Sequence, residues 1–299
     1  MCYQFNQQPT HSKGCRLGGM IMKCLCYLWL VIGLISLPVI SLAGPEEDRL
    51  AYQNYFKERF PQVQFDEFIN GIYAIDQGVR EQWESIEELP PYEIAVDEGE
   101  AMMKQELKSG KTLGSCFNGD GMGVAAKYPY FDLDKGEVIT LAVAINNCLV
   151  ENGEQPLPYL QGPMASILAY LASMSRGLPI NVEDPSKHPE ALKAYEKGKH
   201  FYYARRGKMN MSCAHCHVDY AGRSLRGNIL GPGLGQVSHF PVYRSKWGNV
   251  GTLHRRIRGC LSQMVAKPFE AQSMEYRNLE YFMSYMSNGL TWNGPGVRF

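Results

Sequence analysis

The sequence predicts a mainly α-helical protein that contains two tandem copies of one unit. The stretch GKTLGSCFNGD (110–120) aligns with the stretch GKMNMSCAHCH (207–217), with Gly, Lys, Ser and Cys at matching places. Further along the chain, AYLASMSRGL (169–178) aligns with YFMSYMSNGL (281–290). These features keep one order, and a cysteine lies between them in each half. We therefore infer an internal duplication rather than a coincidence.

The second half shows the periodicity of helices. Between residues 188 and 207, one face collects Leu192, Tyr195, Gly198 and Tyr202, and the pattern ends at a glycine. Near the end of the chain, an i, i+3, i+4, i+7 stripe consists of Leu279, Phe282, Met283 and Met286. Long strands of period two are absent. Each copy is therefore expected to contain a first helix, a cysteine motif, a loop and a last helix.

The N-terminus has the features of an export signal. Residues 24–43 carry no charge, Lys23 precedes them, and Ser41 and Ala43 are small residues at the positions that a signal peptidase reads. We expect a signal peptide at residues 1–43 and a periplasmic protein with no membrane attachment after cleavage. The alternative is an uncleaved transmembrane anchor, because the run is long enough to span a bilayer.

The rest of the chain divides into three predicted parts. Residues 44–98 form an N-terminal extension, residues 99–180 form the first copy and residues 188–299 form the second. The segment between the copies is rich in proline and polar residues, as is typical of a linker.

Charge is distributed unevenly along the chain. Residues 44–200 carry 14 basic and 26 acidic side chains, whereas residues 201–299 carry 13 basic and 4 acidic ones. A positive C-terminal part suits an anionic substrate or an acidic partner. Nucleic acid is not expected as a partner, because the chain is predicted to be exported and contains no recognition motif.

The second copy contains a haem attachment motif. Cys213, Cys216 and His217 form C-x-x-C-H, in which two thiols add to the vinyl groups of one porphyrin and the histidine becomes the proximal iron ligand. The segment Gly231-Pro232-Gly233 resembles the one whose proline backbone orients this imidazole in small cytochromes c. A half zinc site would need two more ligands at matching spacing, and none is found. We predict one covalently bound haem c in a cytochrome c-like domain at 188–299.

The sixth iron ligand is open at this point. A methionine would give an electron carrier of high potential, and the downstream candidates are Met264, Met274, Met283 and Met286. Cys260 competes with them. The preceding residues His254, Arg255, Arg256 and Arg258 would stabilise its thiolate and form an anion site beside it.

The first copy has lost its haem motif. Cys116 keeps the first attachment thiol, but Gly119 and Asp120 stand where the second thiol and the proximal histidine would be. We therefore predict a haem-less cytochrome c-like domain in which Cys116 and Cys148 form a disulfide that contributes about 2 to 4 kcal/mol. Two free thiols are the alternative, and this alternative is less expected in an oxidising compartment. Cys260 is then the unpaired cysteine.

Three stretches of the second copy resemble the SoxA family of sulfur-oxidising cytochromes. They are SCAHCHVDYAGRSLRG, PVYRSKWGNVGTLHRRIRGC and KPFEAQSMEYRNLEYFMSYMSNGL. The likeness is dense from residue 202 to residue 296 and looser from residue 99 to residue 177. Some members of the family carry two haems and others carry one. The missing motif of the first copy places this chain with the single-haem members.

The resemblance implies roles for individual residues. Cys213 and Cys216 attach haem, His217 is the proximal ligand, and Cys260 is both the distal ligand and the catalytic residue, found in the family as a persulfide. Arg256 matches the substrate-binding arginine of the family.

The resemblance also implies an activity and partners. The family acts as an L-cysteine S-thiosulfotransferase, which oxidatively conjugates thiosulfate to a cysteine of a SoxYZ-like carrier protein. It works as a heterodimer with a SoxX-like cytochrome c. The alternative function is a simple periplasmic electron-transfer cytochrome c with His/Met ligation.

Overall fold

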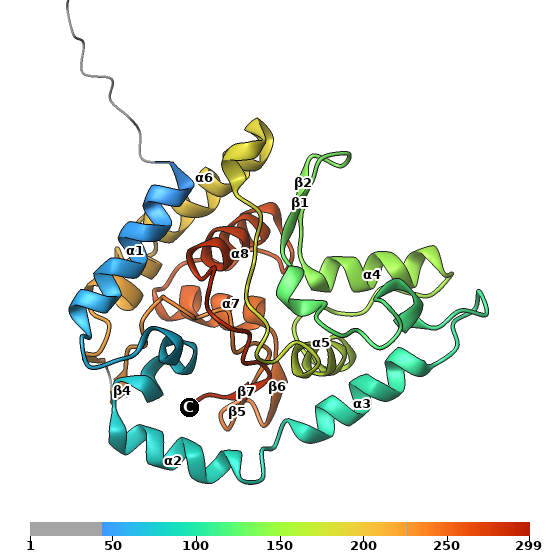
Figure 1. Ribbon diagram of the computed structural model, residues 1–299, viewed down its shortest axis with the longest axis horizontal. Coiled ribbons are helices and arrows are strands. Elements are labelled where there is room, and N and C mark those ends of the chain that lie inside the picture. Colours follow the sequence, from blue (N-terminus) through green and yellow to red (C-terminus); the bar gives the residue numbers. More distant parts are fainter. Residues whose placement is uncertain (1–43, 226) are drawn as a thin grey trace, which may run out of the picture. The chain divides into compact units, whose positions relative to one another are not determined.

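Helices make up most of the secondary structure (Figure 1). The computed structural model describes residues 44–225 and 227–299, so the predicted signal peptide lies outside the described residues. The helical segments are α1 (Pro45–Arg59), η1 (Phe65–Ala74), α2 (Gln77–Glu87), α3 (Glu93–Lys104), η2 (Leu113–Cys116), η3 (Ala125–Lys127), α4 (Leu141–Glu151), α5 (Pro163–Ser173), η4 (Pro185–Lys187), α6 (Pro189–Tyr203), η5 (His215–Asp219), α7 (Leu253–Gln263) and α8 (Met274–Met286). The strands are β1 (Tyr130–Asp132), β2 (Glu137–Ile139), β3 (Ser224–Leu225), β4 (Asn228–Ile229), β5 (Val242–Arg244), β6 (Asn249–Gly251) and β7 (Gly296–Val297). No helix in the described ranges is both long and apolar enough to cross a bilayer.

The two copies contain the same elements in the same order. The first consists of α3, η2, the β1–β2 hairpin, α4 and α5, and the second of α6, η5, the β5–β6 hairpin, α7 and α8. Tyr130 pairs with Ile139 in the first hairpin, and Val242 pairs with Gly251, 112 positions further on, in the second. Thr140 and Thr252, which cap α4 and α7, keep the same spacing. The structure thus supports the predicted duplication.

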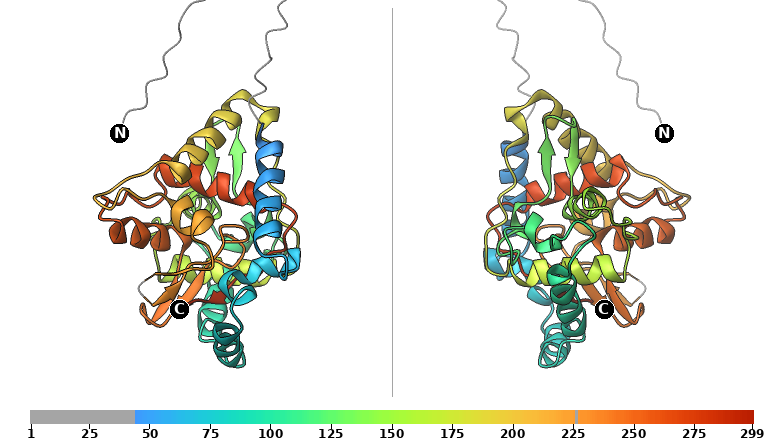
Figure 2. Two further views of the ribbon diagram at one scale, coloured as in Figure 1. Left: turned by 90° about the vertical axis from the view of Figure 1, so that its left-hand side faces the viewer. Right: turned by 90° about the vertical axis from the view of Figure 1, so that its right-hand side faces the viewer.

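Each hairpin packs against the last helix of the other copy. Strand β2 contacts α8, and strand β6 contacts α5. Arg277 of α8 donates to the Val138 carbonyl at 3.1 Å and pairs with Glu137 at 3.1 Å. The β1–β2 hairpin lies in the upper part of Figure 1, and the β5–β6 hairpin lies in the lower part, as the turned views of Figure 2 also show. This reciprocal packing joins both copies into one compact unit.

A glycine lies at the crossing of the first and last helix in each copy. A Cβ atom on Gly99 of α3 would lie 2.1 Å from the carbonyl oxygen of Ser166 in α5. A Cβ atom on Gly198 of α6 would lie 2.0 Å from the carbonyl oxygen of Asn278 in α8. Ser166 and Asn278 are again 112 positions apart. The backbones of each helix pair therefore touch, and only glycine permits this contact.

We expect the substitution Gly198→Ala to destabilise the protein by about 3 kcal/mol, because the new methyl group meets backbone that cannot rotate away. Thermal unfolding should show a melting temperature lower by roughly 10 °C. The matched control is Gly78→Ala in α2, where the nearest atom to the new Cβ is 3.6 Å away. That substitution should leave the free energy of unfolding unchanged or raise it by up to about 1 kcal/mol. Equal melting temperatures for both variants would contradict the close crossing.

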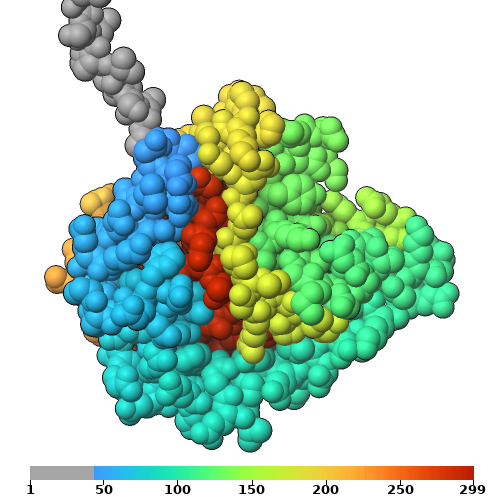
Figure 3. Space-filling model, viewed as in Figure 1, coloured from blue at the N-terminus to red at the C-terminus, as the bar shows by residue number. Residues whose placement is uncertain are grey.

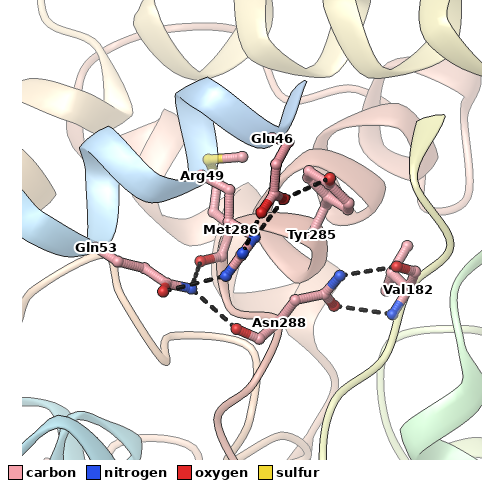
Figure 4. Close-up of polar contacts among 7 residues, drawn as sticks. All are labelled: Glu46, Arg49, Gln53, Val182, Tyr285, Met286 and Asn288. Atoms are coloured by element: carbon pink, nitrogen blue, oxygen red, sulfur yellow. Dashed lines mark hydrogen bonds and ion pairs between the residues drawn. The ribbon is translucent and has the colours of Figure 1, made fainter. Parts of the chain in front are cut away.

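The N-terminal segment packs against the second copy. The Tyr52 hydroxyl of α1 lies 3.0 Å from the Tyr202 hydroxyl of α6, and both side chains are buried. Gln53 donates to the carbonyls of Met286 and Asn288 at the end of α8 (Figure 4). Figure 3 shows the C-terminal part of the chain in red between α1 and the linker that joins the copies.

The predicted boundary between the N-terminal extension and the first copy, at residue 99, lies inside a helix, because α3 begins at Glu93.

Candidate haem and anion site

The C-x-x-C-H motif lies on a tight turn that leads into the π-helical segment η5. Ser212 caps the start of this turn. Its hydroxyl accepts a hydrogen bond from the backbone amide of His215 at 3.3 Å and is hydrogen-bonded to Nδ1 of the His215 ring at 2.7 Å. Cys213 and Cys216 are half-buried free thiols. Burial raises the pKa of Cys213 to about 12 and also raises that of Cys216, and in both cases the nearby Cys260 adds to the effect. Both thiols therefore lie near Cys260 and are shielded from solvent.

His217 is held in the tautomer that can bind iron. Its Nδ1 donates to the Gly231 carbonyl at 2.9 Å, which leaves the lone pair on Nε2. Burial lowers the pKa of His217 to about 4, so the ring is neutral at pH 7. The amide of Gln236 lies 3.2 Å from Nε2 and can donate to this lone pair. The acceptor for Nδ1 is the residue before Pro232, so the prediction that the proline backbone itself orients the ring is wrong by one position.

A glycine permits the close packing behind the proximal histidine. The Gly233 amide donates to the His217 carbonyl at 2.8 Å. A Cβ atom on Gly233 would lie 2.1 Å from the Tyr52 hydroxyl and 2.3 Å from the Tyr202 hydroxyl. The predicted glycine-proline-glycine segment and the N-terminal helix α1 together fix the position of His217.

Helix α7 presents Cys260 and Arg256 one turn apart. Its buried residues Leu253, Ile257 and Leu261 anchor it in the core. Side chains four positions apart share one face of a helix. The positive charge of Arg256 opposes the rise in the pKa of Cys216 that burial causes, and it adds to the effect of burial in lowering the pKa of His217. The face with Cys260 and Arg256 is therefore directed toward the C-x-x-C-H motif.

The other two arginines of α7 have partners already. Arg255 donates to the Asn249 side chain at 2.6 Å and stacks on Trp247, with 4.3 Å between the guanidinium and the ring centroid. Arg258 donates to the Phe269 carbonyl.

Arg256 differs from them, because its half-buried guanidinium makes no hydrogen bond or ion pair with any other described residue. Arg256 is thus the arginine that is available to an anion beside Cys260.

Sequence reasoning missed one further cation, Arg244 of β5. Burial lowers the pKa of Arg244, the charge of Arg256 lowers it further, and Cys260 acts in the opposite direction. Arg244 therefore lies near both residues, and its buried Nε has no hydrogen-bond partner among the described residues. Asp132 occupies the equivalent position of the first copy. Comparison of the two copies, which shows this reversal of charge, could have found Arg244.

The methionine candidates for the sixth ligand lie in two environments. Met264, Met283 and Met286 are buried in the hydrophobic core of the second copy, whereas Met274 is 38 % exposed. Cys260 is half-buried and unpaired, and its charge contributes to the raised pKa of both Cys213 and Cys216, so it lies near both attachment thiols.

The first copy contains the predicted disulfide. Cys116 and Cys148 are joined with an S–S distance of 1.99 Å, and the bond links η2 to α4. Between Cys116 and β1 the chain is 15 residues shorter than between Cys213 and β5. The extra residues of the second copy follow His217, whose equivalent in the first copy is Asp120, and they precede Val237, whose equivalent is Ala125. In the first copy Cys116 is thus bonded to Cys148, and a carboxylate stands at the position of the histidine.

Two thiols that can be alkylated and a neutral imidazole are the groups that attach and ligate haem c, so Cys213, Cys216 and His217 fit this group. A family model described as "SoxA/TsdA, cytochrome c domain" matches residues 98–180 and 197–292. The "L-cysteine S-thiosulfotransferase subunit SoxA" of Allochromatium vinosum is 51% identical over 90% of this chain and 96% of that protein. The chain belongs to the SoxA family.

Other SoxA proteins and one solved structure extend this result. SoxA of Chlorobaculum tepidum is 51% identical over 85% of this chain and 87% of that protein. A crystal structure described as SoxXA from P. pantotrophus superposes with a TM-score of 0.68 and 29% identity, and covers 76% of this chain and 86% of that one. The predicted mainly helical, cytochrome c-like fold is thus confirmed. The gap in the family match, 181–196, coincides with the linker and the first half of α6.

Proposed function

We propose that this protein is the catalytic cytochrome subunit of a thiosulfate-oxidising enzyme, an L-cysteine S-thiosulfotransferase. The observation that carries the proposal is the unpartnered Arg256 guanidinium one turn from the free, half-buried Cys260, on a helix directed toward the haem attachment motif. A cation beside a nucleophilic sulfur is the arrangement needed to capture a sulfur dianion and form a bond to it.

The first step is capture of thiosulfate and formation of an S–S bond. Arg256 holds the sulfonate oxygens through charge-assisted hydrogen bonds, with Arg244 adding positive charge nearby. The Cys260 thiolate and the outer sulfur of thiosulfate then join and lose two electrons, which gives Cys260–S–S–SO₃⁻. Haem c supplies a one-electron carrier for the removal of these electrons.

The second step passes the group to a carrier. A thiolate of the carrier protein attacks the sulfane sulfur of the adduct, which is the sulfur between the Cys260 sulfur and the SO₃ group. The bond to Cys260 breaks, so the carrier becomes R–S–S–SO₃⁻ and the Cys260 thiolate is released. No net electrons move in this step. Splitting the reaction in this way is covalent catalysis, in which one cysteine takes part in both steps.

One covalently bound haem c is proposed for the second copy alone. Cys213 and Cys216 would attach it, His217 would be the proximal ligand and Cys260 the distal one. His217 supports this assignment, because its ring is neutral and its Nδ1 proton is held by the Gly231 carbonyl, which places the lone pair on Nε2. The disulfide and the shortened loop of the first copy support a single haem rather than two.

The partners and the compartment are proposed from the relatives and the chain. The solved structure to which this chain is similar is described as SoxXA, which supports a heterodimer with a SoxX-like cytochrome c. The name L-cysteine S-thiosulfotransferase of the relatives supports thiosulfate as the substrate and a protein cysteine as the acceptor. We propose a SoxYZ-like carrier as the protein that bears this cysteine. The predicted signal peptide and the disulfide support a periplasmic location.

The proposal is tested with the purified holoprotein, its cytochrome partner, thiosulfate and a carrier that bears one reactive cysteine. Mass spectrometry of the carrier should detect the added thiosulfonate group, with two electrons transferred for each group added. A pyridine haemochrome assay should give one haem for each chain. An unmodified carrier together with normal electron exchange would favour the alternative, a simple electron-transfer cytochrome c with His/Met ligation.

A further inference from the structure

A small cavity lies where the two copies meet, and five pairs of its wall residues occupy equivalent positions of the two copies. These pairs, each separated by 112 residues, are Ala125 and Val237, Tyr128 and Phe240, Leu141 and Leu253, Ala142 and His254, and Leu168 and Glu280. Three of the pairs are apolar in both copies. In the other two, the second copy replaces an apolar residue with a titratable one.

The two replacements lie beside each other. His254 of α7 is 1% exposed, and its Nε2 lies 3.0 Å from the Glu280 carboxylate of α8. Burying two such groups costs free energy that the apolar pair of the first copy avoids. A specific contact is therefore needed to explain why α7 carries a histidine at this place.

His254 makes that contact through its other nitrogen. The backbone amide of Gln272 donates to His254 Nδ1 at 3.0 Å, so Nδ1 is the nitrogen of the ring that carries a lone pair. The side-chain oxygen of Gln272 accepts a hydrogen bond from the Thr140 hydroxyl at 2.7 Å. Thr140 belongs to the first copy and caps α4, the helix that the disulfide ties down at Cys148.

The contacts form a continuous path from the first copy to α7. Gln272 adopts a left-handed backbone conformation with φ of 61°, which is unusual for a residue other than glycine and is held by the hydrogen bonds on both sides. Thr252, the cap of α7, is also tied to the first copy, because its amide donates to Leu160 at 3.1 Å and its hydroxyl to Tyr159 at 3.0 Å. The whole first turn of α7 is thus anchored to the haem-less copy.

We propose that the haem-less copy positions the catalytic helix, and that Thr140, Gln272 and His254 are positioning residues for Arg256 and Cys260. Arg256 lies two residues after His254, so a rotation of α7 about its axis would displace Arg256 and Cys260 together, away from the C-x-x-C-H motif. The inference rests on the proposed function, because it assigns these residues to the same site. It explains why a copy that has lost its own haem site is retained in contact with α7.

The experiment compares disruptive and conservative changes at both ends of the path in the holoprotein. Thr140→Val removes the hydroxyl that donates to Gln272, whereas Thr140→Ser keeps it. His254→Ala removes the acceptor for the Gln272 amide, whereas His254→Asn places an oxygen near the position of Nδ1. Ile145→Val in the core of α4 is the matched control, because it loosens the same helix without touching the path. The readouts are the low-spin EPR spectrum, the KM and kcat for thiosulfate, and the melting temperature.

Thr140→Val and His254→Ala should split or broaden the low-spin signal and raise KM for thiosulfate about tenfold, since small displacements of a binding group have large effects. The two conservative variants should restore the wild-type values, and Ile145→Val should lower only the melting temperature. Wild-type spectra and KM in the two disruptive variants would overturn the positioning role. A wild-type protein that does not conjugate thiosulfate would overturn the proposed function instead, and the EPR comparison would still decide whether the path holds Cys260 in place.

Discussion

Cys260→Met should abolish conjugation of thiosulfate, with a loss of at least about 10³-fold in kcat, because the sulfur that forms the covalent adduct is removed. Haem content should not change, since Cys213, Cys216 and His217 remain. The low-spin spectrum should change from thiolate-type to thioether-type ligation, because methionine replaces cysteine at the same place on α7. Optical and EPR spectra, together with the intact mass of both proteins, provide the measurement.

The control for Cys260 is Met264→Leu, four residues further along the chain. Met264 is buried in the core, so its removal should leave the ligation unchanged. If the wild type already shows His/Met ligation, and Cys260→Met leaves the spectrum unchanged, the protein is an electron carrier. The role of Cys260 as ligand and nucleophile would then be wrong.

Arg256→Ala should lower kcat/KM for thiosulfate about 100-fold, which corresponds to the loss of a charge-assisted pair worth about 2 to 3 kcal/mol. The haem spectrum should stay intact, because Arg256 is not a ligand. Most of the loss should appear in KM, so that a high concentration of thiosulfate restores part of the rate. Arg256→Lys should give an intermediate value, since lysine keeps the charge but loses the planar fork. Steady-state kinetics at constant ionic strength provide the measurement.

Arg258→Ala is the matched control, because this arginine lies on the same helix only two residues before Cys260 and therefore on a different face. Its guanidinium already binds the Phe269 carbonyl, so its removal should change kcat/KM by no more than about threefold. Normal turnover by Arg256→Ala would contradict the assignment and would direct attention to Arg244, the other cation near Cys260.

The features that could be predicted from the sequence are those whose chemistry depends on spacing along the chain. The C-x-x-C-H motif, the unpaired Cys260 and its arginines lie within single elements, so their order already indicates a site. The disulfide was predictable because two copies could be aligned, which places Cys116 opposite Cys148.

Features that depend on tertiary packing were not predictable in this way. Arg244 is 16 residues from Cys260 in the sequence. It lies near Cys260 because β5 pairs with β6, and β6 leads into α7. The path through Gln272 joins residues from three elements, and no periodicity marks it. The packing of Tyr52 on Tyr202 likewise brings the N-terminal helix to the proximal histidine from 150 residues away.

The glycine crossings bear on how a cytochrome c-like unit can lose its cofactor. The crossing at Gly99 is as close as the crossing at Gly198, although no residues near it could hold a haem. The cohesion of the terminal helices therefore comes from backbone contact and apolar burial, which the polypeptide supplies by itself. A duplicated gene could then lose the ligands of one copy step by step while each intermediate still folded. The fold of the first copy is then retained as a support for the second copy, and its surface can acquire new contacts with the second copy.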